Sequence, residues 1–135
     1  MTRGQRNHNP LNIRRSKGTH WLGEAKHQTD REFVRFRCDL MGFRAAFRIL
    51  RTYIQLHHLT TLKLIIYRWA PPEDGNCTAS YLYTVSERSH IRQSQELTYE
   101  NEDALIAIVR AMAWVESHMS NIDPDLLHQA YLLAK

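Results

Sequence analysis

From Asp39 onward, apolar side chains recur at steps of three and four, which is the pattern of helices that bury one face. Asp39 itself favours the N-cap position of the first of these helices. A second helix is expected to begin at Thr60 or Thr61 and to end before Pro71-Pro72, because proline cannot continue a helix. The same periodicity predicts three further helices, at about 78–87, 101–118 and 124–133.

Residues 1–36 lack this periodicity and are polar and basic. Within them, the segment 33–36 alternates apolar and polar side chains, which is typical of a half-buried strand. We therefore expect a small sheet near Ile13, Trp21 and Phe33. The predicted fold is α+β and mainly α, with a region of loops and short strands (1–36) followed by a helical region (39–134).

The composition is that of one globular domain covering residues 1–135: the chain is 43% hydrophobic and 24% charged, with no linker or repeat. Its net charge of +4 favours negatively charged partners, including nucleic acid, acidic glycopolymers and the carboxylates of cell-wall peptides. Cys38 and Cys77 are expected to be reduced, and neither they nor the scattered histidines have the spacing of a metal site. No cofactor is implied.

No apolar run approaches the roughly 20 residues that cross a bilayer, so membrane insertion is not expected. The first residues carry the positive charge of a signal peptide without the apolar stretch that must follow it. The sequence therefore predicts a protein that is made in the cytoplasm and carries no Sec signal.

Three carboxylates in the helical region are candidates for acid/base chemistry. Glu116 continues the apolar face of the predicted helix at 101–118, and partial burial there would make a general acid available near neutral pH. Glu73 and Asp74 follow Pro71-Pro72, where a rigid turn could hold the second carboxylate that glycoside cleavage needs. Alternatively, Glu116 reaches water or pairs with an arginine, and Glu73 and Asp74 belong to an ordinary solvated turn.

Other polar residues suit ligand binding. Arg44, Arg48 and Arg51 form a basic stripe that could bind phosphates or carboxylates, or could equally be a solvated face with structural salt bridges. No helix-turn-helix, RNA-binding or zinc-finger motif accompanies the stripe, so a nucleic-acid partner rests on charge alone.

A group of asparagines near the start of the chain offers amide donors and acceptors for sugar hydroxyls and N-acetyl groups. They are Asn7, Asn9 and Asn12, and Trp21 could add an apolar platform for the face of a sugar. Asparagine is equally a turn former, and a tryptophan in a small domain usually lies in the core.

The segment Arg6-Asn7-His8-Asn9-Pro10-Leu11-Asn12-Ile13-Arg14-Arg15 resembles the Arg-Asn-Asn-Asn-Pro-x-Asn-Ile-Arg signature of a family of small phage and prophage proteins. Further blocks match in order: Trp21-Leu22-Gly23, residues 33–36, residues 42–45 continuing to 50–53, and Arg68-Trp69-Ala70-Pro71-Pro72 with Asn76, Thr78 and Tyr81. Such proteins are common in gut Bacteroidetes and are labelled phage structural proteins or lysozyme-like proteins. Over residues 3 to about 118, the resemblance implies a lysozyme-like helical domain.

The Asn-Pro-x-Asn-Ile segment is also similar to the Asn-Asn-x-x-Gly-Ile loop of cell-wall glucosaminidases, which lines the glycan cleft behind a catalytic glutamate. In those enzymes the glutamate precedes the loop, whereas this chain has no acid before Glu24. Either Glu116, Glu73 or Glu24 supplies the acid, or the cleft binds glycan without cutting it.

Three functions follow as hypotheses. The first is a phage-derived lysozyme-like protein that engages peptidoglycan and hydrolyses its β-1,4 bonds, acting at the cell wall or in a phage particle. Glu116 would be the acid and Glu73 or Asp74 the second carboxylate. The substrate would be held by the following residues: Asn7, Asn9, Asn12, Trp21, Arg44 and Tyr81. The second hypothesis is a non-catalytic virion or assembly component whose partners are phage structural proteins, and the third is a basic nucleic-acid-binding protein.

Overall fold

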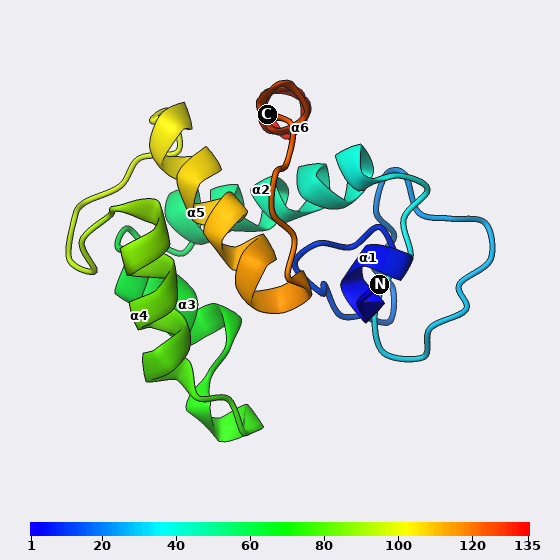
Figure 1. The fold of residues 1–135 in the computed structure, drawn as a ribbon, viewed down its shortest axis with the longest axis horizontal. Helices are drawn as coiled ribbons and strands as arrows, with labels where there is room; N and C mark the ends of the chain where they lie inside the picture. The colour runs from blue at the N-terminus through cyan, green and yellow to red at the C-terminus, as the bar shows by residue number, and fades with distance from the viewer.

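The computed structural model describes residues 1–135 and consists of helices joined by loops (Figure 1). The helices are α1 (Arg3–Arg6), α2 (Asp39–Gln55), α3 (Leu62–Trp69), the 3-10 helix η1 (Pro72–Asp74), α4 (Thr78–Ser89), α5 (Glu102–Ser117) and α6 (Pro124–Leu133). No helix is both long enough and apolar enough to span a membrane.

The five helices predicted from the periodic pattern are all present, and local capping explains where most of them begin. The Thr61 hydroxyl accepts from the Leu64 amide, and the Asn101 side chain accepts from the Ala104 amide. Asp123 caps α6, with Pro124 at the first helical position. α2 begins at Asp39 itself, preceded by Cys38, which makes no side-chain cap.

α5 lies across the middle of the molecule and contacts most of the other helices (Figure 1). It packs most extensively on α4, which in turn packs on α3, while α6 packs along α2. The short α1 also contacts α5, on the side where the chain from 7 to 38 forms a long excursion of loops. This arrangement brings the first residues of the chain to the C-terminal end of α5.

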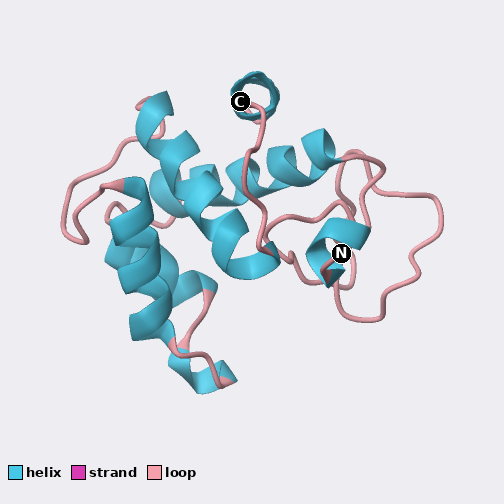
Figure 2. Cartoon of the chain, in the orientation of Figure 1, coloured by secondary structure: helices cyan, strands magenta, loops and turns pink.

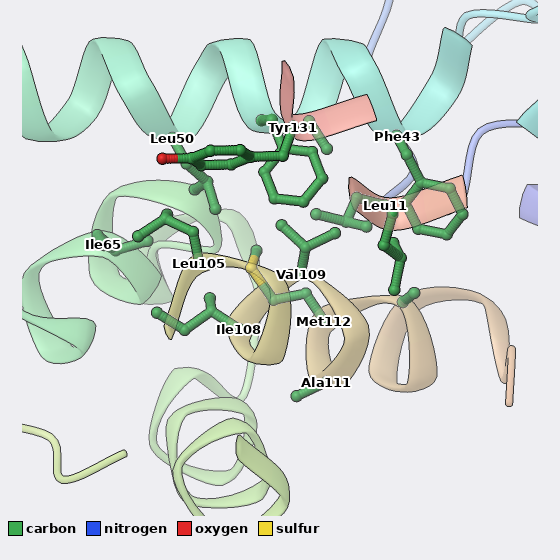
Figure 3. Close-up of a cluster of buried hydrophobic side chains, with 14 of the residues drawn as sticks. Leu11, Phe43, Leu50, Ile65, Leu105, Ile108, Val109, Ala111, Met112 and Tyr131 are labelled. Carbon is green, nitrogen blue, oxygen red and sulfur yellow. The ribbon is translucent and has the colours of Figure 1, made fainter. Parts of the chain in front are cut away.

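The core is built around the apolar face of α5 (Figure 3). Leu105, Ile108 and Met112 of this helix are fully buried. They meet Leu50 of α2 and Tyr131 of α6, and the Tyr131 ring packs edge-on against Phe47 at a centroid distance of 5.6 Å. One continuous core therefore joins all the long helices.

The predicted N-terminal β element is wrong, because the structure is all-helical and has no sheet (Figure 2). Only two isolated bridges occur in this region, Arg14 with Phe33 and Glu24 with Phe36. The alternation at 33–36 does reflect half-burial, since Val34 and Phe36 are buried while Phe33 is partly exposed. Alternating burial therefore does not require that the segment pairs with a neighbouring strand.

Side-chain amides take the place of strand partners in these loops. The fully buried Asn9 side chain donates to the carbonyls of Ile13 (2.9 Å) and Val34 (2.8 Å) and accepts from the Ile13 amide (2.9 Å). Gln28 likewise accepts from the Arg35 amide and donates to the Arg35 carbonyl, both at 2.8 Å. Because these groups are satisfied by amides, the segment is ordered without forming a ladder.

Asp30 links α1 to these loops. Its carboxylate receives two hydrogen bonds from the Arg3 guanidinium, at 2.7 and 2.8 Å, and one from the Asn7 side chain at 3.0 Å. The backbone amides of Glu32 and Phe33 also donate to it. The hydrogen bonds from Arg3, supported by these amides, hold the pKa of Asp30 well below its ordinary value despite partial desolvation.

Asp30 is therefore expected to make the protein acid-sensitive. A carboxyl whose pKa is lowered by folding stabilises the native state above its unfolded pKa of about 4, and this contribution is lost as the pH falls below that value. We expect the melting temperature of Asp30→Asn to lie a few degrees below that of wild type at pH 7. On going from pH 7 to pH 3, the melting temperature of the variant should fall by less than that of wild type. Thermal unfolding at the two pH values measures this.

Glu87→Gln serves as the control, because Glu87 is exposed on α4 and forms no ion pair. It should retain the wild-type dependence on pH. Equal acid sensitivity of Asp30→Asn and wild type would show that Asp30 does not carry this effect.

Candidate functional site

Glu116 lies in the last turn of α5, where it continues the face that buries Ile108 and Met112. Its side chain is half-buried and accepts three hydrogen bonds. Trp69 Nε1 donates to Oε2 at 3.0 Å, Tyr81 Oη donates to the same oxygen at 2.9 Å, and Asn12 Nδ2 donates to Oε1 at 3.2 Å. The carboxyl group is therefore fixed in direction.

The three donors come from three separate segments. Trp69 ends α3, Tyr81 lies in the first turn of α4, and the packing of α3 on α4 and of α4 on α5 brings both to Glu116. Asn12 belongs to the loops and adopts a left-handed backbone (φ 53°), a conformation that asparagine tolerates better than most residues. Its amide also donates to the main-chain oxygen of Glu116 at 3.0 Å, while its Oδ1 is buried without a partner.

Tyr81 serves as a hydrogen-bond donor that keeps its proton. Burial, followed by the charge of Glu116 and the hydrogen bond to it, raises the pKa of the Tyr81 phenol well above its ordinary value of 10. The hydroxyl therefore donates to Glu116 throughout the neutral and mildly alkaline range.

A cleft of about 360 Å³ opens beside Glu116. Aromatic, amide and carboxyl groups line its walls. One of them is the ring of Tyr53, which packs edge-on against Trp69 with 6.4 Å between the ring centroids. The lining residues are Asn12, Ile13, Arg14, Ser16, Thr19, Trp21, Phe33, Ile49, Tyr53, Trp69, Ala70, Asp74, Asn76 and Glu116. Flat rings beside fixed polar groups suit a ligand that has apolar faces and many hydroxyl or amide groups.

Several of the residues proposed from the sequence meet at this cleft. Four of them line it: Asn12, Trp21, Asp74 and Glu116. Tyr81 does not line the cleft but donates a hydrogen bond to Glu116. They come from the loops, from η1, from α4 and from α5. Asp74 is exposed at the end of η1, so a second carboxylate shares the cleft with Glu116.

Other proposed residues lie elsewhere. Asn7 and Asn9 are buried and hold the loops together through Asp30, Ile13 and Val34. Glu73 is exposed and does not line the cleft. Glu24 accepts from the Trp21 backbone amide and lines a neighbouring cavity.

Two members of the arginine stripe on α2 contact the end of α6, whereas the third, Arg51, donates to the Gln55 side chain of α2 at 3.1 Å. Arg44 Nε donates to the Leu133 carbonyl at 3.2 Å, and Arg48 Nη1 donates to the Ala134 carbonyl at 3.1 Å. Because helix ends leave carbonyls unpaired, these guanidinium groups cap α6. Arg44 is therefore placed away from the cleft.

Sequence reasoning missed Trp69, Tyr53 and Asn76 as parts of the site. Trp69 lies at the end of α3, and its indole N–H reaches Glu116. The Arg68-Trp69-Ala70-Pro71-Pro72 block was the available signal, because Trp69 and Ala70 line the cleft and the Asn76 amide donates to the Pro71 carbonyl at 3.0 Å. Tyr53 ends the matching block at residues 50–53, but no chemical pattern there marked it as a cleft residue.

Comparison with known proteins places the chain among bacteriophage proteins. No protein-family model matches it. The chain is 38% identical to protein P5 of Pseudoalteromonas phage PM2 over 117 residues, which cover 85% of this chain and 71% of that protein. It is thus a phage-associated protein. It belongs to the family of the PM2 protein P5.

Proposed function

We propose that the protein engages the glycan strands of peptidoglycan in the cleft and hydrolyses their β-1,4 glycosidic bonds by acid/base chemistry. The observation that carries the proposal is the fixed carboxyl group of Glu116, which is held by three donors in a cleft that Asp74 also lines. Two carboxyl groups facing one substrate site are the usual requirement for glycoside hydrolysis.

The walls of the cleft support a sugar as the ligand. The rings of Trp21 and Tyr53 offer apolar surfaces for sugar faces, and the amide of Asn76 offers a donor and an acceptor for hydroxyl or N-acetyl groups. A phage-associated protein has a use for this substrate, because the peptidoglycan wall stands between a phage and the bacterial cytoplasm.

In the proposed reaction, Glu116 first takes up a proton from solvent and then gives it to the glycosidic oxygen as the bond from that oxygen to the anomeric carbon breaks. A water molecule adds its hydroxyl to the anomeric carbon, and its proton passes to the Asp74 carboxylate. The hydrogen bonds from Trp69, Tyr81 and Asn12 stabilise the negative charge that remains on Glu116 after the proton has left.

A non-catalytic role in the virion or in assembly would use the same cleft for binding alone. The nucleic-acid alternative receives less support from the structure, because Arg44 and Arg48 of the basic stripe are already engaged with carbonyls of α6.

The test is incubation of the purified protein with sacculi from Gram-negative cells, followed by mass analysis of the soluble fragments. Fragments with a defined reducing end would support hydrolysis and name the bond, and binding to sacculi without fragments would favour the non-catalytic role. Asp74→Asn and Glu73→Gln form a matched pair in one turn, since only Asp74 lines the cleft. We expect only Asp74→Asn to slow the release of fragments.

A further inference from the structure

A second cavity, of about 620 Å³, adjoins the cleft. Ser16 and Thr19 line both, so the two border the same loop. A further link runs through Trp21, which lines the cleft while its backbone amide donates to Glu24, a residue that lines the second cavity. A ligand seated on Trp21 can therefore extend into this loop cavity.

The loop cavity is strongly basic. Four lysine and arginine side chains line it and only one carboxylate, Glu24, accompanies them. The cations are Arg15, Lys17, Lys26 and Arg31, all exposed. Its apolar lining is confined to Ala25 and Val34, so the cavity suits a charged ligand rather than an apolar one.

These cations are not used by the fold as ion-pair partners. Nearby, Arg3 pairs with Asp30 and Arg14 pairs with Glu32, whereas none of the four cavity cations forms an ion pair. Arg15 makes one hydrogen bond, to the Asp30 carbonyl. The loop therefore holds unneutralised positive charge directly beside the cleft.

We propose that the loop cavity binds the carboxylates of the peptide that branches from the glycan strand. This inference rests on the proposed function, because it places the strand in the cleft. The wall peptide is an acidic chain attached to alternate sugars, so a strand lying over Trp21 presents its branch to the cavity. The protein would then prefer peptide-bearing strands to bare glycan.

The experiment compares binding of soluble glycan strands that carry peptides with binding of the same strands after an amidase has removed them. The variant is Lys17→Glu with Lys26→Glu, since both side chains are exposed and make no hydrogen bond in the fold. The control is Lys63→Glu with Arg92→Glu, an equal change of charge at exposed positions outside both cavities.

Wild type and control are expected to bind peptide-bearing strands roughly tenfold more tightly than stripped strands at low salt, with the difference shrinking as salt is added. The cavity variant should bind both kinds of strand as weakly as wild type binds stripped strands. Its circular dichroism and thermal unfolding should match those of the control.

Equal affinity of wild type for the two kinds of strand would overturn the inference while leaving the proposed function intact. Binding of neither strand would overturn both. A short DNA duplex provides the remaining comparison: if the cavity variant loses affinity for the duplex but not for peptide-bearing strands, the cavity serves nucleic acid and the inference is wrong.

Discussion

Glu116→Gln is expected to lower the rate of fragment release from sacculi at least about 100-fold. Glutamine has nearly the same shape and can still accept from Trp69 and Tyr81, but it has no proton to give to a glycosidic oxygen. The loss should therefore appear in the rate of cleavage and not in the fold. Mass analysis of soluble fragments over time measures it.

The substitution leaves one local conflict, because the new amide group faces the Asn12 amide in place of a carboxylate oxygen. Rotation of the Asn12 amide would supply an acceptor to the glutamine, but it would also turn Oδ1 toward the Glu116 main-chain oxygen, to which the Asn12 amide now donates at 3.0 Å. The cost in the free energy of unfolding should be about 1 kcal/mol. Glu73→Gln, a change of the same kind outside the cleft, should keep full activity. Full activity of Glu116→Gln would remove Glu116 from the reaction.

Gly42→Ala is expected to destabilise the protein by about 2–3 kcal/mol. Gly42 lies in α2 where the loop carrying His8 and Pro10 crosses the helix. A Cβ at this position would lie 2.1 Å from the His8 carbonyl oxygen and 2.8 Å from Pro10 Cδ. Because the closest atom belongs to the backbone, it cannot swing aside as a flexible side chain could. The loop would have to move away from α2.

Unfolding in denaturant, followed by circular dichroism, measures this change. Thr52→Ala is the control, since Thr52 is exposed on the same helix and its change should fall within about 0.5 kcal/mol. Because Asn12 lies four residues beyond His8, Gly42→Ala should also disturb the hydrogen bond to Glu116. An unchanged midpoint for Gly42→Ala would show that the loop does not press on the helix in this way.

The helical half of the fold could be predicted because its information is local. Buried faces recur at helical spacing in α2 and α5, and Thr61, Asn101 and Asp123 act as caps. The loops could not be predicted in this way, since the Asn9 side chain, rather than a neighbouring strand, pairs with the backbone. The short α1 was missed because it has no apolar period.

The residues of the candidate site also differ in whether local sequence could identify them. Glu116 could be singled out from its place on a helical face, and Asp74 from its rigid turn. The donors to Glu116 could not, because their meeting depends on the packing of α3, α4 and the loops. The sequence also could not separate Asn12, which reaches Glu116, from Asn7 and Asn9, because all three have the same side chain.

The end of α5 is tied to the first residues of the chain, and this has a kinetic consequence. Thr2 and Gln5 donate to the Ser117 carbonyl, Ser117 donates to the Pro10 carbonyl, and Asn12 donates to Glu116, across sequence separations of 104 to 115 residues. Closing so long a loop costs entropy before any contact repays it, and non-local contacts slow folding. We therefore expect the helices to gather first and Glu116 to be oriented late. Local opening that frees residues 2–12 would remove the Asn12 hydrogen bond from Glu116 and so inactivate the site, while the helical core remains folded.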